Sequence, residues 1–178
     1  MSLRYKIGLV VLVAVLGTAA LYLPSWWQKY QIDKAISELQ RPYREDVYGG
    51  KTPEETFDMF LGALNKDDLE SASKYFKLNK REEYLEKFKK MKEEGGLAKK
   101  IAEWENARKE WTKVTDTYNN WKTHATVRYT TILGQSVTKN LPDGTGGFIK
   151  HTFPAGKYSN DIIFDLNELT NVWKITLL

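Results

Sequence analysis

Six side chains in this chain have the types needed for acid–base chemistry. Four could accept a proton and two could donate a phenol hydrogen bond, a pairing that many proton-transfer sites use. They are His124, His151, Asp116, Asp161, Tyr118 and Tyr129. The sequence has no GxSxG turn, no P-loop and no dinucleotide-binding glycine pattern, so no motif assigns these side chains to one reaction. We therefore predict no catalytic residues.

The histidines do not form a recognisable metal site. Neither stands in an HxxxH or HExxH pair, and the chain has no cysteine, which excludes disulfides and thiolate ligands. We expect no metal and no cofactor. His124 has the opposite strand parity from Val127 and Tyr129, so it should face away from their packing surface as an ordinary surface or hydrogen-bonded histidine. Tyr129 could line a pocket, although an aromatic residue on an apolar strand face more often belongs to the core.

Four helices are expected to precede the strands, because apolar residues recur there at helical spacing. The expected helices cover 52–66, a short stretch around 69–76, 80–94 and 97–111. The clearest start is the capping box Thr-Pro-Glu-Glu at 52–55, with proline at the first helical position. Asp67 or Asp68 should cap the second helix and Asn79 the third, which two glycines then end.

After Trp111 the apolar period changes to two, as expected for half-buried strands. Strands are expected over 114–118, 123–133, 148–153, 161–166 and 172–177, with turns at 142–147 and 154–156. Helices followed by antiparallel strands predict an α+β domain over 51–178, with the helices packed on one face of a curved sheet.

Residues 7–23 form an uncharged apolar run, and interfacial aromatics follow it. Together they reach the length that a helix needs to cross a bilayer, so we predict a transmembrane signal anchor over 7–27. Its principal anchoring residues are Ile7, Leu12, Leu16, Leu23, Trp26 and Trp27. A cleaved signal peptide, with a weak cleavage site near 17–20, is the alternative.

The charges before the apolar run set its predicted orientation. Arg4 and Lys6 favour a cytoplasmic tail over 1–6, so the main domain would lie outside the cytoplasmic membrane of a single-pass protein. The net charge of +4 includes these two residues, and basic and acidic side chains are equal in number over 51–111. This balance gives no basis for nucleic-acid binding.

Residues 28–50 are expected to form a stalk helix and a linker. Ile32, Ile36 and Leu39 share one helical face, which could contact a partner's helix or a second copy of the chain. The same face could instead lie on the chain's own domain or on the bilayer surface. We expect Pro42 to end the helix, and Gly49-Gly50 to be the flexible end of the linker.

The start of the domain resembles a known superfamily. The segment 52–76, TPEETFDMFLGALNKDDLESASKYF, is similar to the opening of the nuclear-transport-factor-2-like superfamily, nearest its small exported bacterial lipoprotein-like branch. The closing Val172-Trp173-Lys174-Ile175 resembles the last strand of that group. The likeness covers about 52–178, and its motifs encode packing and capping rather than catalysis. The chain departs from many exported relatives because it lacks a lipidated cysteine.

This resemblance implies a cone, a bent antiparallel sheet wrapped around helices, which is often dimeric and encloses a pocket. Members use the cone for isomerase or dehydratase chemistry, for ligand binding or for protein assembly. The residues that could line such a pocket are Phe57, Phe60, Trp104, Tyr118 and Tyr129. The layout of tail, membrane helix and outer cone also resembles the bitopic assembly factor of type IV secretion, except that the tail here is very short.

The sequence thus favours a non-catalytic binding or assembly module of a cell-envelope complex, with the bilayer and a protein partner or a second copy as its contacts. The alternative is a small-ligand-binding or enzymatic cone that uses an internal apolar pocket.

Overall fold

A computed structural model describes residues 26–115 and 120–178, which divide into two units at the boundary between Glu45 and Asp46. In the first unit the described residues form one helix over 26–44. No helix in the described part of the chain is both long and apolar enough to cross a membrane. The predicted anchor residues Ile7, Leu12, Leu16 and Leu23 lie outside the described residues, whereas Trp26 and Trp27 begin the helix and are exposed.

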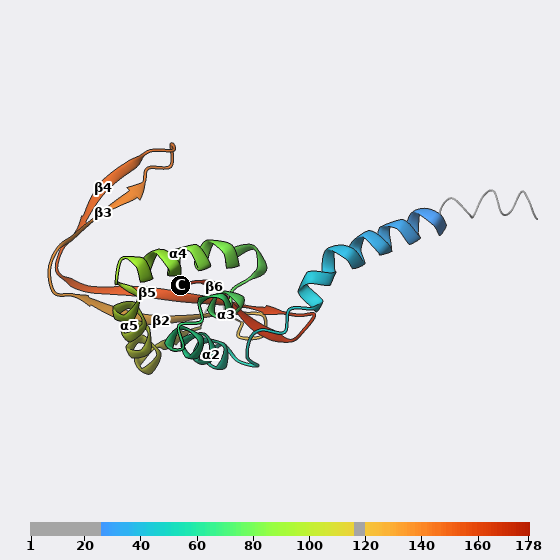
Figure 1. Cartoon of the computed structure of the whole chain (residues 1–178), viewed down its shortest axis with the longest axis horizontal. Helices are drawn as coiled ribbons and strands as arrows, with labels where there is room; N and C mark the ends of the chain where they lie inside the picture. The colour runs from blue at the N-terminus through green and yellow to red at the C-terminus, as the bar shows by residue number, and fades with distance from the viewer. Residues whose placement is uncertain (1–25, 116–119) are drawn as a thin grey trace, which may run out of the picture. The chain divides into compact units, whose positions relative to one another are not determined.

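The second unit has an α+β fold, as predicted (Figure 1). Its helices are α2 (Pro53–Asn65), α3 (Leu69–Lys74), α4 (Arg81–Glu93) and α5 (Leu97–Glu110), with a 3₁₀ turn at Leu78–Lys80. Its strands are β1 (Thr112–Val114), β2 (His124–Leu133), β3 (Val137–Pro142), β4 (Phe148–Phe153), β5 (Gly156–Asn167) and β6 (Val172–Leu177). One antiparallel sheet has the order β1-β2-β5-β6, and β3 pairs with β4.

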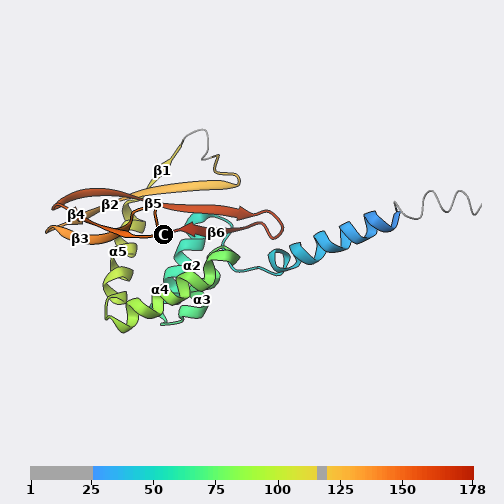
Figure 2. The ribbon, with the colours of Figure 1, turned by 90° about the horizontal axis from the view of Figure 1, so that it is seen from above.

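The helices cover one face of the four-stranded sheet (Figure 2). Between the two layers, aromatic rings from α2, α4 and α5 meet the strands' apolar faces. Phe60 lies at the centre, with its ring centroid 5.8 Å from Phe88 and 5.6 Å from Trp104. Val127 and Ile162 close the core from the sheet side and are fully buried. The expected alternation of β2 is therefore present, with Ala125, Val127 and Tyr129 turned toward the helices.

Two of the predicted helix N-caps are confirmed, and a third is wrong. Thr52 accepts a hydrogen bond from the Glu55 amide, and Asp68 accepts one from the Ser71 amide. Asn79, the predicted cap of α4, lies inside the 3₁₀ turn, and no side chain caps that helix. The 3₁₀ turn leads directly into α4, an arrangement common at helix starts.

Two expectations about the linker were wrong. The first helix continues through Pro42 to residue 44: Pro42 has no N–H to donate, but the Glu45 amide still bonds to the Arg41 carbonyl, so the last turn is kept. The glycines at 49–50 are packed rather than loose. A Cβ on Gly49 would lie 2.3 Å from the Trp173 oxygen, and one on Gly50 would lie 2.6 Å from the Glu55 side chain. The compact unit accordingly begins at Asp46.

The sequence did not reveal β3 or the full length of β5. Beyond Arg128 and Asp161 the sheet narrows to two strands, because β1 pairs only with Thr126–Arg128 and β6 only with Ile163–Asn167. Residues 129–160 therefore form a two-stranded ribbon, the ribbon arm, which ends in the β3–β4 hairpin and extends past the helices in Figure 1.

Candidate functional site

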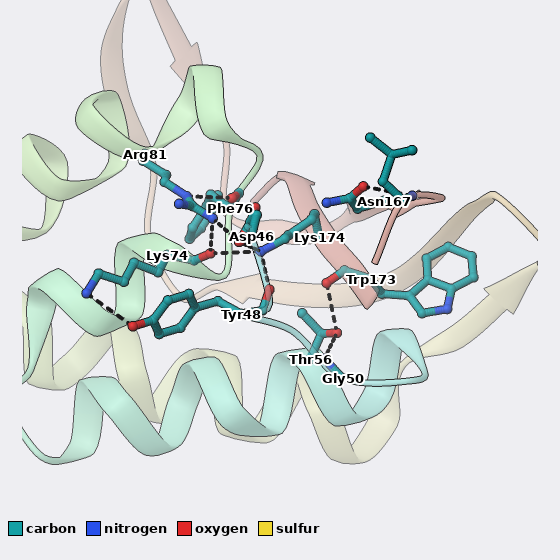
Figure 3. Close-up of polar contacts among 11 residues, drawn as sticks. Asp46, Tyr48, Gly50, Thr56, Lys74, Phe76, Arg81, Asn167, Trp173 and Lys174 are labelled. Carbon is teal, nitrogen blue, oxygen red and sulfur yellow. Dashed lines mark hydrogen bonds and ion pairs between the residues drawn. The ribbon is translucent and has the colours of Figure 1, made fainter. Parts of the chain in front are cut away.

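A buried ion cluster joins the first residues of the domain to its last strand (Figure 3). The Lys174 ammonium lies 2.6 Å from Asp46 Oδ1, and the Arg81 guanidinium lies 2.6 Å from the same oxygen. Lys174 also donates to the carbonyls of Tyr48 and Lys74. Only 3% of Lys174 and 5% of Asp46 are exposed. Because two cations share one carboxylate, the cluster carries one uncompensated positive charge.

The burial of this cluster and its excess positive charge favour the neutral form of Lys174. The pKa of Lys174 is lowered from 10.5 to about 8, mainly by burial and to a smaller extent by the nearby Arg81, while the Asp46 carboxylate acts in the opposite direction. The Arg81 guanidinium is fixed by the carbonyls of Lys74 at 2.8 Å and of Phe76 at 3.2 Å. The arrangement clamps three chain segments together, and neither described groove includes Asp46, Arg81 or Lys174 in its lining.

Backbone contacts continue this clamp along the outer edge of β6. The Trp173 amide donates to the Gly50 carbonyl at 2.9 Å, and the Ile175 amide donates to the Tyr75 carbonyl at 2.9 Å. The buried Thr56 hydroxyl accepts from the Gly50 amide at 2.9 Å and lies 3.2 Å from the Trp173 carbonyl oxygen. The β6 edge is therefore occupied by the chain's own segments.

A second polar cluster lies on the sheet face opposite the helices. His124 Nδ1 is 2.6 Å from Asp165 Oδ1, and Asp165 Oδ2 accepts from Lys77 at 2.7 Å and from Thr176 at 2.8 Å. Burial alone would raise the pKa of Asp165, but these hydrogen bonds outweigh it and hold the pKa below its ordinary value.

A carboxylate on Nδ1 orients an imidazole so that Nε2 can act as a base. However, neither of the two described grooves includes His124 or Asp165 in its lining. The parity prediction for His124 agrees with this position on the far face of the sheet.

The remaining candidate residues do not gather at one place. Asp161 pairs with Arg128 through two hydrogen bonds of 2.7 and 2.8 Å, further along the same sheet face. His151 is exposed on β4, with its ring centroid 4.6 Å from that of Phe153. Asp116 and Tyr118 lie outside the described residues. Among described residues, no group of three or more acidic, histidine or cysteine side chains is placed to hold a metal ion.

Four of the residues suggested as pocket lining are buried in the structure. Phe57 and Phe60 are fully buried, and Trp104 and Tyr129 are nearly so. The Trp104 indole nitrogen is buried without a hydrogen-bond partner among the described residues. Tyr129 also borders an open groove of about 610 Å³ between α5 and the start of the ribbon arm. A second groove, of about 450 Å³, lies between the ends of α2, α4 and α5.

The sequence analysis overlooked the partners in both polar clusters, which are Asp46, Lys77, Arg81, Asp165 and Lys174. One signal was available, because Lys174 stands between Trp173 and Ile175 in an otherwise apolar closing strand. A lysine in that position needs an acidic partner. No protein-family model, curated protein or solved structure shows a significant match to this chain.

Proposed function

We propose that this chain is a single-pass membrane protein whose extracytoplasmic domain is a non-catalytic binding and assembly module of a cell-envelope complex. The observation that carries the proposal is the exposed apolar face of the helix over 26–44, where Ile32, Ile36 and Leu39 are 58%, 46% and 74% exposed. Such a face is costly to leave in water and is typical of a surface that a partner covers. The uncharged run at 7–23 supports the anchor.

The arrangement of the candidate bases favours binding over catalysis. A catalytic site needs its base, its donor and a substrate space together. The described bases instead lie on the sheet face away from the core or on the ribbon arm, and the aromatic side chains pack between helices and sheet. The nuclear-transport-factor-2-like cone remains our proposal for the domain's ancestry. The groove beside Tyr129 supports small-ligand binding as the second candidate.

The partner can be identified by crosslinking the full-length protein in its native membrane, then affinity purification in mild detergent and mass spectrometry. We expect a stoichiometric envelope partner. We also expect it to be lost after Ile36→Asp combined with Leu39→Asp, because charge on the apolar face opposes its burial. Ser37→Asp is the control, since it adds an acidic side chain on the other side of the helix. Recovery of the protein alone would contradict the proposal and direct attention to ligand screening.

The predicted topology has a separate test, because the chain contains no native cysteine. Single variants Ser2→Cys and Ser159→Cys can be labelled in intact cells with a membrane-impermeant maleimide. The proposal predicts labelling of the second variant only, until the membrane is permeabilised. Labelling of neither, or of both, would overturn the proposed orientation.

A further inference from the structure

The edge of β2 is unusually open. On one side β2 pairs with β5 along its whole length, but on the other side β1 covers only Thr126–Arg128. Among the described residues, nothing pairs with the following edge, residues 130–134. The groove of about 610 Å³ runs beside it. Every residue from 129 to 135 borders this groove. Because successive side chains of a strand point to opposite faces of the sheet, a groove on one face would contact only every second residue. The groove therefore lies along the edge of the strand.

The sequence of this edge lacks the usual protection against strand pairing. Natural edge strands carry lysine, proline or other charges that prevent another strand from adding. The β4–β5 side of the ribbon arm follows this rule with Lys150, Pro154 and Lys157. The β2 segment at 129–133 reads Tyr-Thr-Thr-Ile-Leu, with no charge and no proline. These residue types also have high β propensity.

An isolated two-stranded ribbon is marginally stable in water, and a third strand would stabilise it. The outward side chain of Ile132 is 69% exposed, which leaves an apolar group at the centre of the open edge. Both facts would favour the addition of another strand to this edge.

We propose that the covering strand is the same segment of a second copy, which pairs antiparallel with residues 130–134 about a two-fold axis at Ile132. An isologous contact requires a self-complementary surface. In this register Ile132 meets its own copy, and Thr131 meets Leu133 of the partner subunit. No like charges are opposed, because the segment has none. The partner contributes the strand that the ribbon lacks, and the sheets of the two copies become continuous.

Pairing through the arm's outer edges is disfavoured by charge. A two-fold contact centred in β3 would bring Lys139 near its copy, and one centred in β4 would do the same for Lys150. An unrelated extended segment could also occupy the β2 edge. The self-complementary, uncharged sequence favours the second copy, and the test distinguishes the two.

Cysteine crosslinking in the full-length protein tests this arrangement in a background free of native cysteine. Ile132→Cys places two thiols at the two-fold axis, where opposite Cβ atoms of antiparallel strands lie about 4.5–5.5 Å apart. Lys157→Cys is the matched control, because Lys157 lies opposite Ile132 on β5. Its two copies would be three strand spacings apart, roughly 14 Å, which is too far for a disulfide.

We expect oxidation in native membranes to give a covalent homodimer with Ile132→Cys and none with Lys157→Cys. Ile132→Lys should abolish co-purification of two differently tagged copies, since it places like charges directly opposite each other at the axis, while Ser159→Lys should preserve it. Equal crosslinking of both cysteine variants, no crosslinking of either, or a disulfide to a different protein would overturn the proposal. The inference rests on the proposed binding role. The tests are independent, because a homodimer can form without an envelope partner, and the partner can bind without this edge.

Discussion

The two edges of the four-stranded sheet differ in how far the chain's own segments cover them. The outer edge of β6 is closed by Gly50 and by Tyr75, whose carbonyls accept hydrogen bonds from β6, and a buried ion cluster fastens both segments. The β2 edge beyond Arg128 has no such cover among the described residues. The closed edge fastens the first residues of the domain to its last strand, whereas the open edge is suited to intermolecular contact. The difference predicts very unequal responses to substitution.

The largest effect is expected from Asp46→Ala. This change removes the anion between Lys174 and Arg81 and leaves two cations facing each other in a buried site. Loss of one partner from a buried ion pair typically costs about 3–5 kcal/mol. Urea unfolding at pH 7 should show this loss. Lys174→Met is the control, and it should cost much less because Asp46 keeps Arg81. Equal losses would contradict the charge argument.

Substitution of Thr56 should have the next largest effect. Thr56→Val keeps the shape of the side chain but leaves the Gly50 amide without its acceptor at the closed edge. A buried unsatisfied donor costs about 1–3 kcal/mol. Thermal unfolding measures the loss. Thr130→Val, on an exposed position of β2, is the matched control and should change stability little. Similar shifts for the two variants would show that the closed edge is not a special stabilising feature.

The lowered pKa of Lys174 should make the free energy of unfolding depend on pH. Its folded pKa of about 8 lies below the unfolded value near 10.5, so between these values the unfolded chain binds more protons. The free energy of unfolding contributed by this group therefore rises with pH in that window, and the gain is lost as pH falls through about 8. Between pH 7 and 9.5, wild type should gain about 1–2 kcal/mol relative to Lys174→Met. Parallel pH profiles for the two proteins would rule out a lowered pKa.

The smallest effect on folding is expected at the open edge. Ile132→Thr alters a side chain that is 69% exposed, so its free energy of unfolding should stay within about 0.5 kcal/mol of wild type under conditions where the chain is monomeric. A loss comparable to that of Thr56→Val would mean that Ile132 supports the fold of its own chain. The open edge would then not be a free surface.

Much of the fold could be predicted because its signals are local. The Thr52 cap, the Asp68 cap and the strand parity that separates His124 from Tyr129 each depend on neighbours within a few residues. The strand at 137–142 was missed because its residues alternate weakly and it pairs only with another exposed strand. The candidate site was less predictable, since Lys174 meets a carboxylate 128 positions away.

By itself, the sequence determined that helices precede antiparallel strands, most of the residues that form the aromatic core and the apolar run at the start of the chain. The spacing of apolar residues that marks a helix or a strand lies within that one element, so it can be recognised from a single stretch of sequence. Only the tertiary structure decided which edge of the sheet is closed, which carboxylate lies beside Lys174 and which strand remains open. Those outcomes depend on register and on contacts between distant segments, and a single stretch of sequence does not contain that information.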